Sequence, residues 1–159
     1  MKPQLTKKTA DIIVGIQRAV KKNDLCDINH GGCAYFARFV YEKLRQLGID
    51  AGIFAYAEDQ HFKKYNNGED TSFCHVFLKL GKFYFDGEDT VTDRRKIMAS
   101  RGRKFVQVEY DFLTKTTPIE DEDLWNSSFS IKERLKLKDI VEEFFANIRT
   151  PQLQLQLNF

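Results

Sequence analysis

The chain has 159 residues, of which 42% are hydrophobic and 14 are Phe. This is enough apolar material for the core of one domain, and it excludes a disordered chain. With 25 basic and 23 acidic residues the formal net charge is +2, which argues against a dedicated nucleic-acid-binding protein, because such proteins are usually more basic. No apolar run is long enough to span a membrane, so we expect no membrane partner.

The N-terminal segment and the cysteines indicate a cellular compartment. The stretch over 10–20 is interrupted by Asp11, Gln17 and Arg18, so it predicts an amphipathic helix and not the apolar part of a signal peptide. Three cysteines, an odd number, do not make a disulfide framework. We therefore expect a reducing, cytoplasmic setting.

Hydrophobic periodicity predicts two helices followed by a strand. Apolar residues recur every three or four positions over 6–22 and over 33–47, and Gly48 follows in the position that ends a helix. The apolar run over 51–57 predicts a buried strand, and the polar stretch over 59–72 predicts a loop.

The next segments predict an antiparallel sheet. Residues 73–80 and 83–86 read as two strands of a hairpin, with Gly81 and Lys82 as its two-residue turn. The basic stretch 89–103 is expected to hold a short helix, and the alternation over 104–112 predicts a fourth strand.

The last segments complete an α+β layout. An acidic loop is expected over 118–123, and an amphipathic helix over 131–149. In the tail over 152–159 leucines alternate with polar residues, so we expect a strand that pairs with a sheet edge of this domain or of a partner chain. The interpretation is a single domain over 1–159, with its core over 28–112.

Cys33 is the first candidate for chemistry, because it follows Gly31 and Gly32 and opens the second predicted helix. The partial positive charge at a helix N-terminus stabilises a thiolate, which is the nucleophilic form of a cysteine. The glycines allow a tight turn and leave backbone N–H groups open to an oxyanion. A free cysteine is also often a small buried apolar residue, so position alone leaves both interpretations open.

The predicted hairpin brings a histidine and an aspartate together. With the turn at Gly81 and Lys82, Leu80 pairs with Phe83, and His75 lies opposite position 88 on the same face as Asp86. That diagonal is within reach of an imidazole–carboxylate hydrogen bond. Taken separately, each residue is more often structural, but the pair has the geometry of a base and its orienter.

Four segments carry a resemblance to a known family: GGCAYFA over 31–37, LRQLGIDA over 44–51, HVFL over 75–78 and FYFDG over 83–87. In order and spacing they resemble the nucleophile helix, the histidine strand and the aspartate-closing strand of the papain-like cysteine hydrolase superfamily. The closest resemblance is to the transglutaminase-like branch, which includes bacterial leader peptidases and arylamine acetyltransferases. The resemblance covers about residues 28 to 90, a little over a third of the chain.

The resemblance implies a papain-like α+β fold, with the nucleophile helix packed on an antiparallel sheet, and no cofactor. It implies a triad of Cys33, His75 and Asp86 that hydrolyses or transfers the acyl group of an amide, isopeptide or thioester in a peptide or small amide substrate. Two departures occur: Ala34 stands where many members have Trp, and no Gln precedes the cysteine nearby. Asn29 is the oxyanion candidate, although it fits a turn equally well.

Two alternatives stay open. A zinc site could draw on Cys26, His30, Cys33, Cys74 and His75, but their spacing departs from common structural zinc sites, so we expect no metal. We also expect Cys26 and Cys74 to be dispensable, with Cys74 facing away from the site into the core.

The second alternative is a catalytically inactive papain-like binding or adaptor protein. Its candidate surface is a basic run that could bind phosphate, nucleic acid or an acidic partner. A solvated charged loop explains the same run, and we favour that interpretation. The run comprises Arg94, Arg95, Lys96, Arg101, Arg103 and Lys104.

Overall fold

A computed structural model describes residues 2–25, 28–29, 31–96, 104–121 and 129–148. The described helices are α1 (Lys2–Lys22), α2 (Cys33–Gln46), α3 (Asp59–Asn66), α4 (Tyr110–Thr116) and α5 (Ile131–Asn147), with a short 3-10 helix η1 (Arg94–Lys96). The described strands are β1 (Gly52–Ala57), β2 (His75–Leu80), β3 (Phe83–Phe85), β4 (Thr90–Val91) and β5 (Lys104–Gln107). The α+β class expected from the sequence is confirmed.

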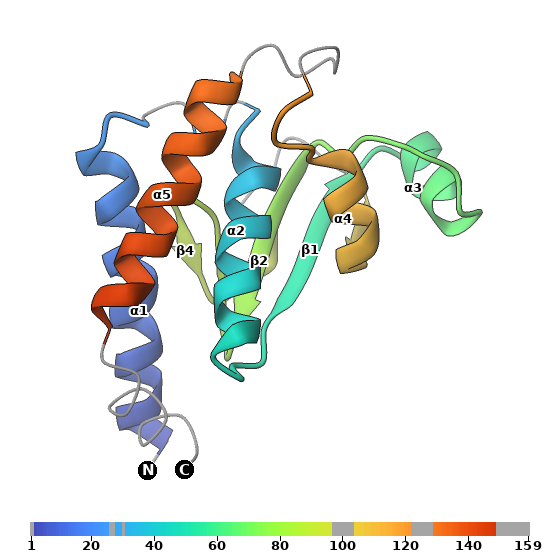
Figure 1. The fold of residues 1–159 in the computed structure, drawn as a ribbon. Helices are drawn as coiled ribbons and strands as arrows, with labels where there is room; N and C mark the ends of the chain where they lie inside the picture. The colour runs from blue at the N-terminus through green and yellow to red at the C-terminus, as the bar shows by residue number, and fades with distance from the viewer. Residues whose placement is uncertain (1, 26–27, 30, 97–103, 122–128, 149–159) are drawn as a thin grey trace.

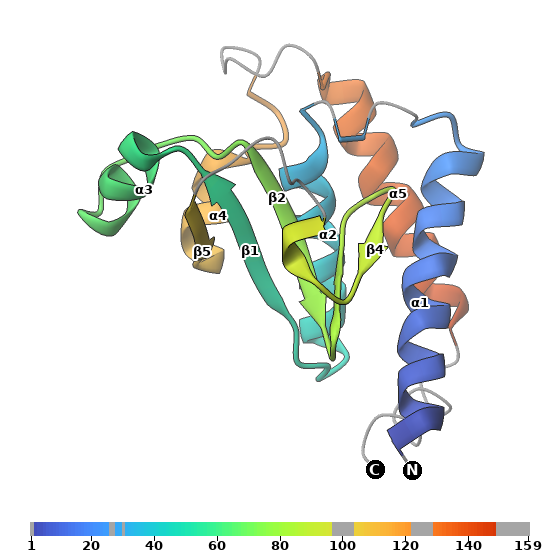
Figure 2. The same cartoon turned by 180° about the vertical axis from the view of Figure 1, so that it is seen from behind.

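The strands form one antiparallel sheet in the order β4-β3-β2-β1-β5. Helices gather on one of its faces, where α2 lies against β2 and α5 packs on both α1 and α2 (Figure 1). Seen from behind, the opposite face of the sheet carries no long helix among the described residues (Figure 2). The arrangement is therefore a helical layer on an antiparallel sheet.

The core lies between these two layers. Helix α2 forms its centre, because most of its apolar residues face inward. Its buried residues are Tyr35, Phe36, Ala37, Phe39, Val40 and Leu44. From α1, Ile13 and Ile16 are fully buried in the same core. At about 1.5–3 kcal/mol for each buried large apolar side chain, this packing fixes α2 on the sheet.

Aromatic residues form a second, smaller cluster that includes buried Tyr56 and Phe77. Phe54 and Phe105 stack with ring centroids 4.9 Å apart, and the Arg94 guanidinium lies 3.8 Å from the centroid of Phe105. Cross-strand aromatic pairs of this kind stabilise the pairing of neighbouring strands.

The β2–β3 hairpin has the predicted register. Leu80 pairs with Phe83, and Leu78 pairs with Phe85. Gly81 has a positive φ of 59°, a conformation that glycine adopts without steric cost, and this allows the two-residue turn. Helix α5 begins at Ile131, as expected from the sequence. A capping box that was not predicted precedes it, in which Ser130 and Glu133 bond each other's backbone N–H groups.

Two predicted segments are wrong. The loop expected over 59–72 contains α3, whose Tyr65 ring packs 4.8 Å from that of Phe112. This tertiary contact, and not local periodicity, holds the helix in place. The strand expected over 104–112 ends at Gln107, and α4 follows because Leu113 turns into the core.

Four further segments can be compared with the predictions. The second predicted strand begins at His75 and not at residue 73, and β4 was not predicted. The short helix expected within 89–103 is represented by η1. The tail over 152–159 lies outside the described residues. Among the residues that the structure describes, none of the helices has the length and apolar character needed to cross a membrane.

Candidate active site

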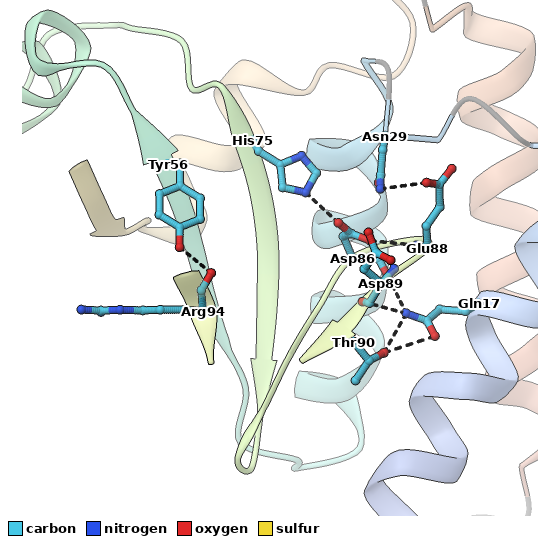
Figure 3. A network of polar contacts seen from close by, with 9 residues as sticks. All are labelled: Gln17, Asn29, Tyr56, His75, Asp86, Glu88, Asp89, Thr90 and Arg94. Atoms are coloured by element: carbon cyan, nitrogen blue, oxygen red, sulfur yellow. Dashed lines mark hydrogen bonds and ion pairs between the residues drawn. The ribbon is translucent and has the colours of Figure 1, made fainter. Parts of the chain in front are cut away.

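His75 and Asp86 meet at one end of the β2–β3 hairpin. His75 opens β2 opposite Tyr56 of β1, and Asp86 directly follows the last residue of β3. The Nε2 atom of His75 lies 2.8 Å from Oδ2 of Asp86, and each side chain is only 1% exposed (Figure 3). The structure thus brings together the two residues that the predicted register places on one face.

The loop after Asp86 holds its second carboxylate oxygen. The backbone N–H groups of Glu88 and Asp89 donate to Oδ1 of Asp86 at 2.8 and 2.7 Å. Burial alone would raise the pKa of Asp86. The hydrogen bonds from His75 and from the two backbone N–H groups outweigh burial and lower the pKa below its ordinary value. The aspartate is therefore held as a carboxylate facing the imidazole.

Cys33 is the first residue of α2, and Gly32 is the N-cap of this helix. Glycine has no side chain with which to cap the first N–H groups, so they stay available to a ligand. A Cβ atom on Gly32 would lie 2.6 Å from the carbonyl oxygen of Ile28 and 2.8 Å from the ring of Phe129. Only glycine lets the chain pass this close before the cysteine.

The Cys33 thiol lies close enough to His75 to raise the pKa of the imidazole. Because Nε2 of the imidazole is held by Asp86, Nδ1 is the ring nitrogen left for the thiol. Burial lowers the pKa of His75, but the hydrogen bonds to Asp86 and Cys33 and the charges of both groups raise it to about 9. The imidazole is therefore protonated at neutral pH.

A cleft of about 480 Å³ opens beside the thiol. Its apolar part includes Ala34, Phe73, Val76 and Leu113, and its polar part includes Asp70, Ser72, Lys115 and Thr116. Cys33 is half-buried and lines this cleft. Clefts of this size commonly hold small molecules or single side chains of a peptide.

Asn29, the oxyanion candidate, also lines the cleft. Its Nδ2 atom donates to Oε2 of Glu88 at 3.4 Å, and its Oδ1 atom is buried without a hydrogen-bond partner (Figure 3). The amide donor therefore faces Glu88, so a role in an oxyanion hole requires the side chain to turn. The backbone N–H groups at the start of α2 need no such change.

Cys74 differs from its predicted place. We expected it in the core, but it is half-buried and lines the same cleft as Cys33. The reason is that β2 begins only at His75, so the alternation of a strand does not extend back to Cys74. The two cysteines are free thiols.

The zinc alternative receives no group of ligands from the described part of the chain: no cluster of three or more His, Cys, Asp or Glu residues able to hold a metal occurs there. Cys26 and His30 lie outside the described residues.

In the basic run, Arg95 pairs with Asp93 at 2.8 Å, and Arg94 covers Phe105. Arg101 and Arg103 of that run lie outside the described residues.

Two residues near the His75–Asp86 pair, Glu88 and Gln17, could not be identified from the sequence. Glu88 contacts Asn29, and Gln17 of α1 donates to the backbone of the loop that follows Asp86 (Figure 3). Gln17 appeared in the sequence only as a polar interruption of an apolar segment. The one signal was its position beside the buried residue Ile16, at the border of the apolar face.

Comparisons of this chain with protein-family models, with curated proteins and with solved structures give no significant match.

Proposed function

We propose that this chain is a cysteine-dependent hydrolase or acyltransferase with a papain-like, transglutaminase-like fold, in which Cys33 is the nucleophile, His75 the base and Asp86 its orienter. One observation carries the proposal. The His75–Asp86 pair is buried and joined at 2.8 Å, and the Cys33 thiol lies beside it at a helix N-terminus and borders a cleft. A nucleophile, a base and a third group that orients the base are the elements of nucleophilic catalysis.

The first chemical step forms an acyl-enzyme. A protonated imidazole beside a thiol stabilises the thiolate, and the Cys33 sulfur attacks the carbonyl carbon of the substrate. The negative charge moves to the carbonyl oxygen, where backbone N–H groups at the start of α2 can donate to it. His75 then gives the proton on Nδ1 to the leaving amine or thiolate as the bond to carbon breaks.

The second step releases the acyl group. Water, or an acceptor amine, attacks the thioester carbon while Nδ1 of His75 takes its proton, and the Cys33 thiolate leaves. Asp86 accepts a hydrogen bond from the Nε2–H group throughout, so it fixes the ring and stabilises the imidazolium. Hydrolysis and acyl transfer differ only in the nucleophile of this step.

The proposed substrate is a peptide or small amide that contains an amide, isopeptide or thioester bond, and the cleft would hold its acyl group. Its apolar wall, which includes Phe73, Val76 and Leu113, fits an apolar portion of the acyl group. The free thiols Cys33 and Cys74 suit a reducing, cytoplasmic setting. No cofactor enters this mechanism.

Alkylation tests the proposal with Cys74 as an internal comparison, because both cysteines are half-buried and line one cleft. Iodoacetamide is added at pH 6.5 for increasing times, and each cysteine is followed by peptide mass spectrometry. We expect Cys33 to react at least about tenfold faster than Cys74. In His75→Gln this advantage should disappear. Equal rates for the two cysteines in the unaltered protein would refute an activated nucleophile.

Turnover is tested with fluorogenic peptide amides and acyl thioesters. Hydrolysis, or transfer to an added amine, should be lost in Cys33→Ser and retained in Cys26→Ser and Cys74→Ser. A fast-reacting Cys33 without turnover of any of these acyl compounds would favour the inactive binding protein. Loss of activity in Cys26→Ser together with stoichiometric zinc would favour the metal site instead.

A further inference from the structure

Gln17 reaches the candidate site from a helix far away in the sequence. Its Nε2 atom lies 3.0 Å from the carbonyl oxygen of Asp86, 3.0 Å from that of Asp89 and 3.0 Å from Oγ1 of Thr90 (Figure 3). Its Oε1 atom lies 3.3 Å from Oγ1 of Thr90. One side-chain amide of α1 thus contacts both ends of the loop from Asp86 to Thr90.

These contacts complete a closed turn around the carboxylate. On the inner side, the N–H groups of Glu88 and Asp89 donate to Oδ1 of Asp86. The carbonyl oxygen of Asp89 accepts from the N–H group of Asp86 at 3.1 Å and also from Gln17. The inner N–H groups hold the carboxylate only while the turn keeps this shape, and Gln17 bonds the carbonyl groups that define it.

Strand pairing and two neighbouring residues also contact this loop. It lies between β3 and β4, and β4 has only two residues, each paired with β3. Gly87 packs against Ile28, and Glu88 accepts the long hydrogen bond from Asn29. By contrast, α1 is already fixed by buried apolar side chains such as Ile13 and Ile16. The amide of Gln17 is therefore not required to place the helix, but it is well placed to fix the loop.

We propose that Gln17 is a positioning residue for the Asp86–His75 pair, acting through the loop from Asp86 to Thr90. The inference rests on the proposed function only in that the positioned pair is the proposed orienter and base. Without the amide, the turn opens, the inner N–H groups move away from the carboxylate, and the oxygen facing His75 loses its fixed direction. The effect on the imidazole is indirect, so Gln17 is not itself a catalytic residue.

The test uses Gln17→Leu, which keeps the bulk but removes all four contacts, and Ile16→Val as the matched control in the same helix. Ile16→Val weakens the packing of α1 without touching the loop. NMR titration of the imidazoles, assigned with His75→Gln, gives the pKa of His75 in each variant. Melting temperature is measured in parallel, to show how far each variant loosens the fold.

We expect Gln17→Leu to lower the pKa of His75 by about one unit, a tenfold change in proton affinity. Ile16→Val should leave the pKa of His75 unchanged even though it lowers the melting temperature. Thr90→Val, which removes one partner of the amide, should shift it less in the same direction. This variant serves if Gln17→Leu does not fold. A pKa of His75 that stays unchanged in folded Gln17→Leu and in folded Thr90→Val would overturn the inference.

The titration also separates the two proposals. A shifted imidazole in a protein that turns over no acyl substrate keeps the positioning role and refutes the hydrolase. Turnover of an acyl substrate together with an unchanged pKa of His75 in Gln17→Leu supports the hydrolase and refutes the positioning role of Gln17.

Discussion

Asp86→Asn keeps the size of the side chain but removes the negative charge that faces His75. Burial then lowers the pKa of the imidazole, and only Cys33 still opposes it. The pKa of His75, about 9 in the unaltered protein, should fall toward its ordinary value of 6.5. The full elevation of about 2.5 units, to which both Asp86 and Cys33 contribute, corresponds to about 3 kcal/mol at about 1.4 kcal/mol per unit.

The same change alters how stability depends on pH. Folding raises the pKa of His75 above its unfolded value, so the stabilisation is fully present below pH 6.5 and is lost as the pH rises through about 9. Between pH 6 and 10 the free energy of unfolding should therefore lose about 3 kcal/mol in the unaltered protein, and this loss should be smaller in Asp86→Asn. The variant is then most destabilised near pH 6, and least near pH 10.

Urea unfolding at each pH from 6 to 10 measures this difference, because groups that titrate alike in both proteins cancel. NMR titration gives the pKa of His75 directly. Asp93→Asn is the control, since that carboxylate is remote from the site and pairs with Arg95 at the surface. It should leave the pH dependence unchanged. A stability difference between Asp86→Asn and the unaltered protein that stays constant from pH 6 to 10 would refute the reasoning.

Three further substitutions, each measured by chemical denaturation, test the packing around the site. Gly32→Ala places a methyl group 2.8 Å from the ring of Phe129 and should cost about 1–3 kcal/mol and slow alkylation of the cysteine that follows. Gly87→Ala places a methyl group 2.6 Å from the side chain of Ile28. We expect a similar loss in the free energy of unfolding and a lowered pKa of His75. Arg134→Met removes a buried guanidinium that donates to the carbonyl of Phe129 and should cost about 3 kcal/mol. Losses below about 0.5 kcal/mol would contradict these assignments.

The hairpin could be predicted because its information is local. Gly81 supplies the positive φ of the turn, and the turn length fixes which residues lie opposite each other. Once the register is fixed, His75 and Asp86 share a face, whatever the rest of the chain does. Helix α2 was predictable for the same reason, since its apolar stripe and the glycines at both of its ends lie within a short stretch of sequence.

The parts that could not be predicted depend on contacts distant in sequence. The amide of Gln17 meets a loop about 70 residues later, and no local pattern distinguishes it from an exposed glutamine. Helix α3 has no buried residue, so hydrophobic periodicity does not report it. The predicted strand over 104–112 extends five residues beyond Gln107, the last residue of β5, because the aromatic residues at the start of α4 continue the alternation of β5.

The topology explains why one helix start and two strand ends meet at a single place. Helix α2 is followed by a short connection to β1, which returns in the opposite direction, and β2 pairs antiparallel with β1. Helix α2 and strand β2 therefore run the same way and begin at the same end of the domain (Figure 1). Cys33 opens α2 and His75 opens β2, so the two residues lie near each other. The tight turn then sends β3 back, so that Asp86 arrives at that end as well. Three reversals of direction thus bring a thiol, an imidazole and a carboxylate together, and the packing of α2 on β2 keeps their places fixed.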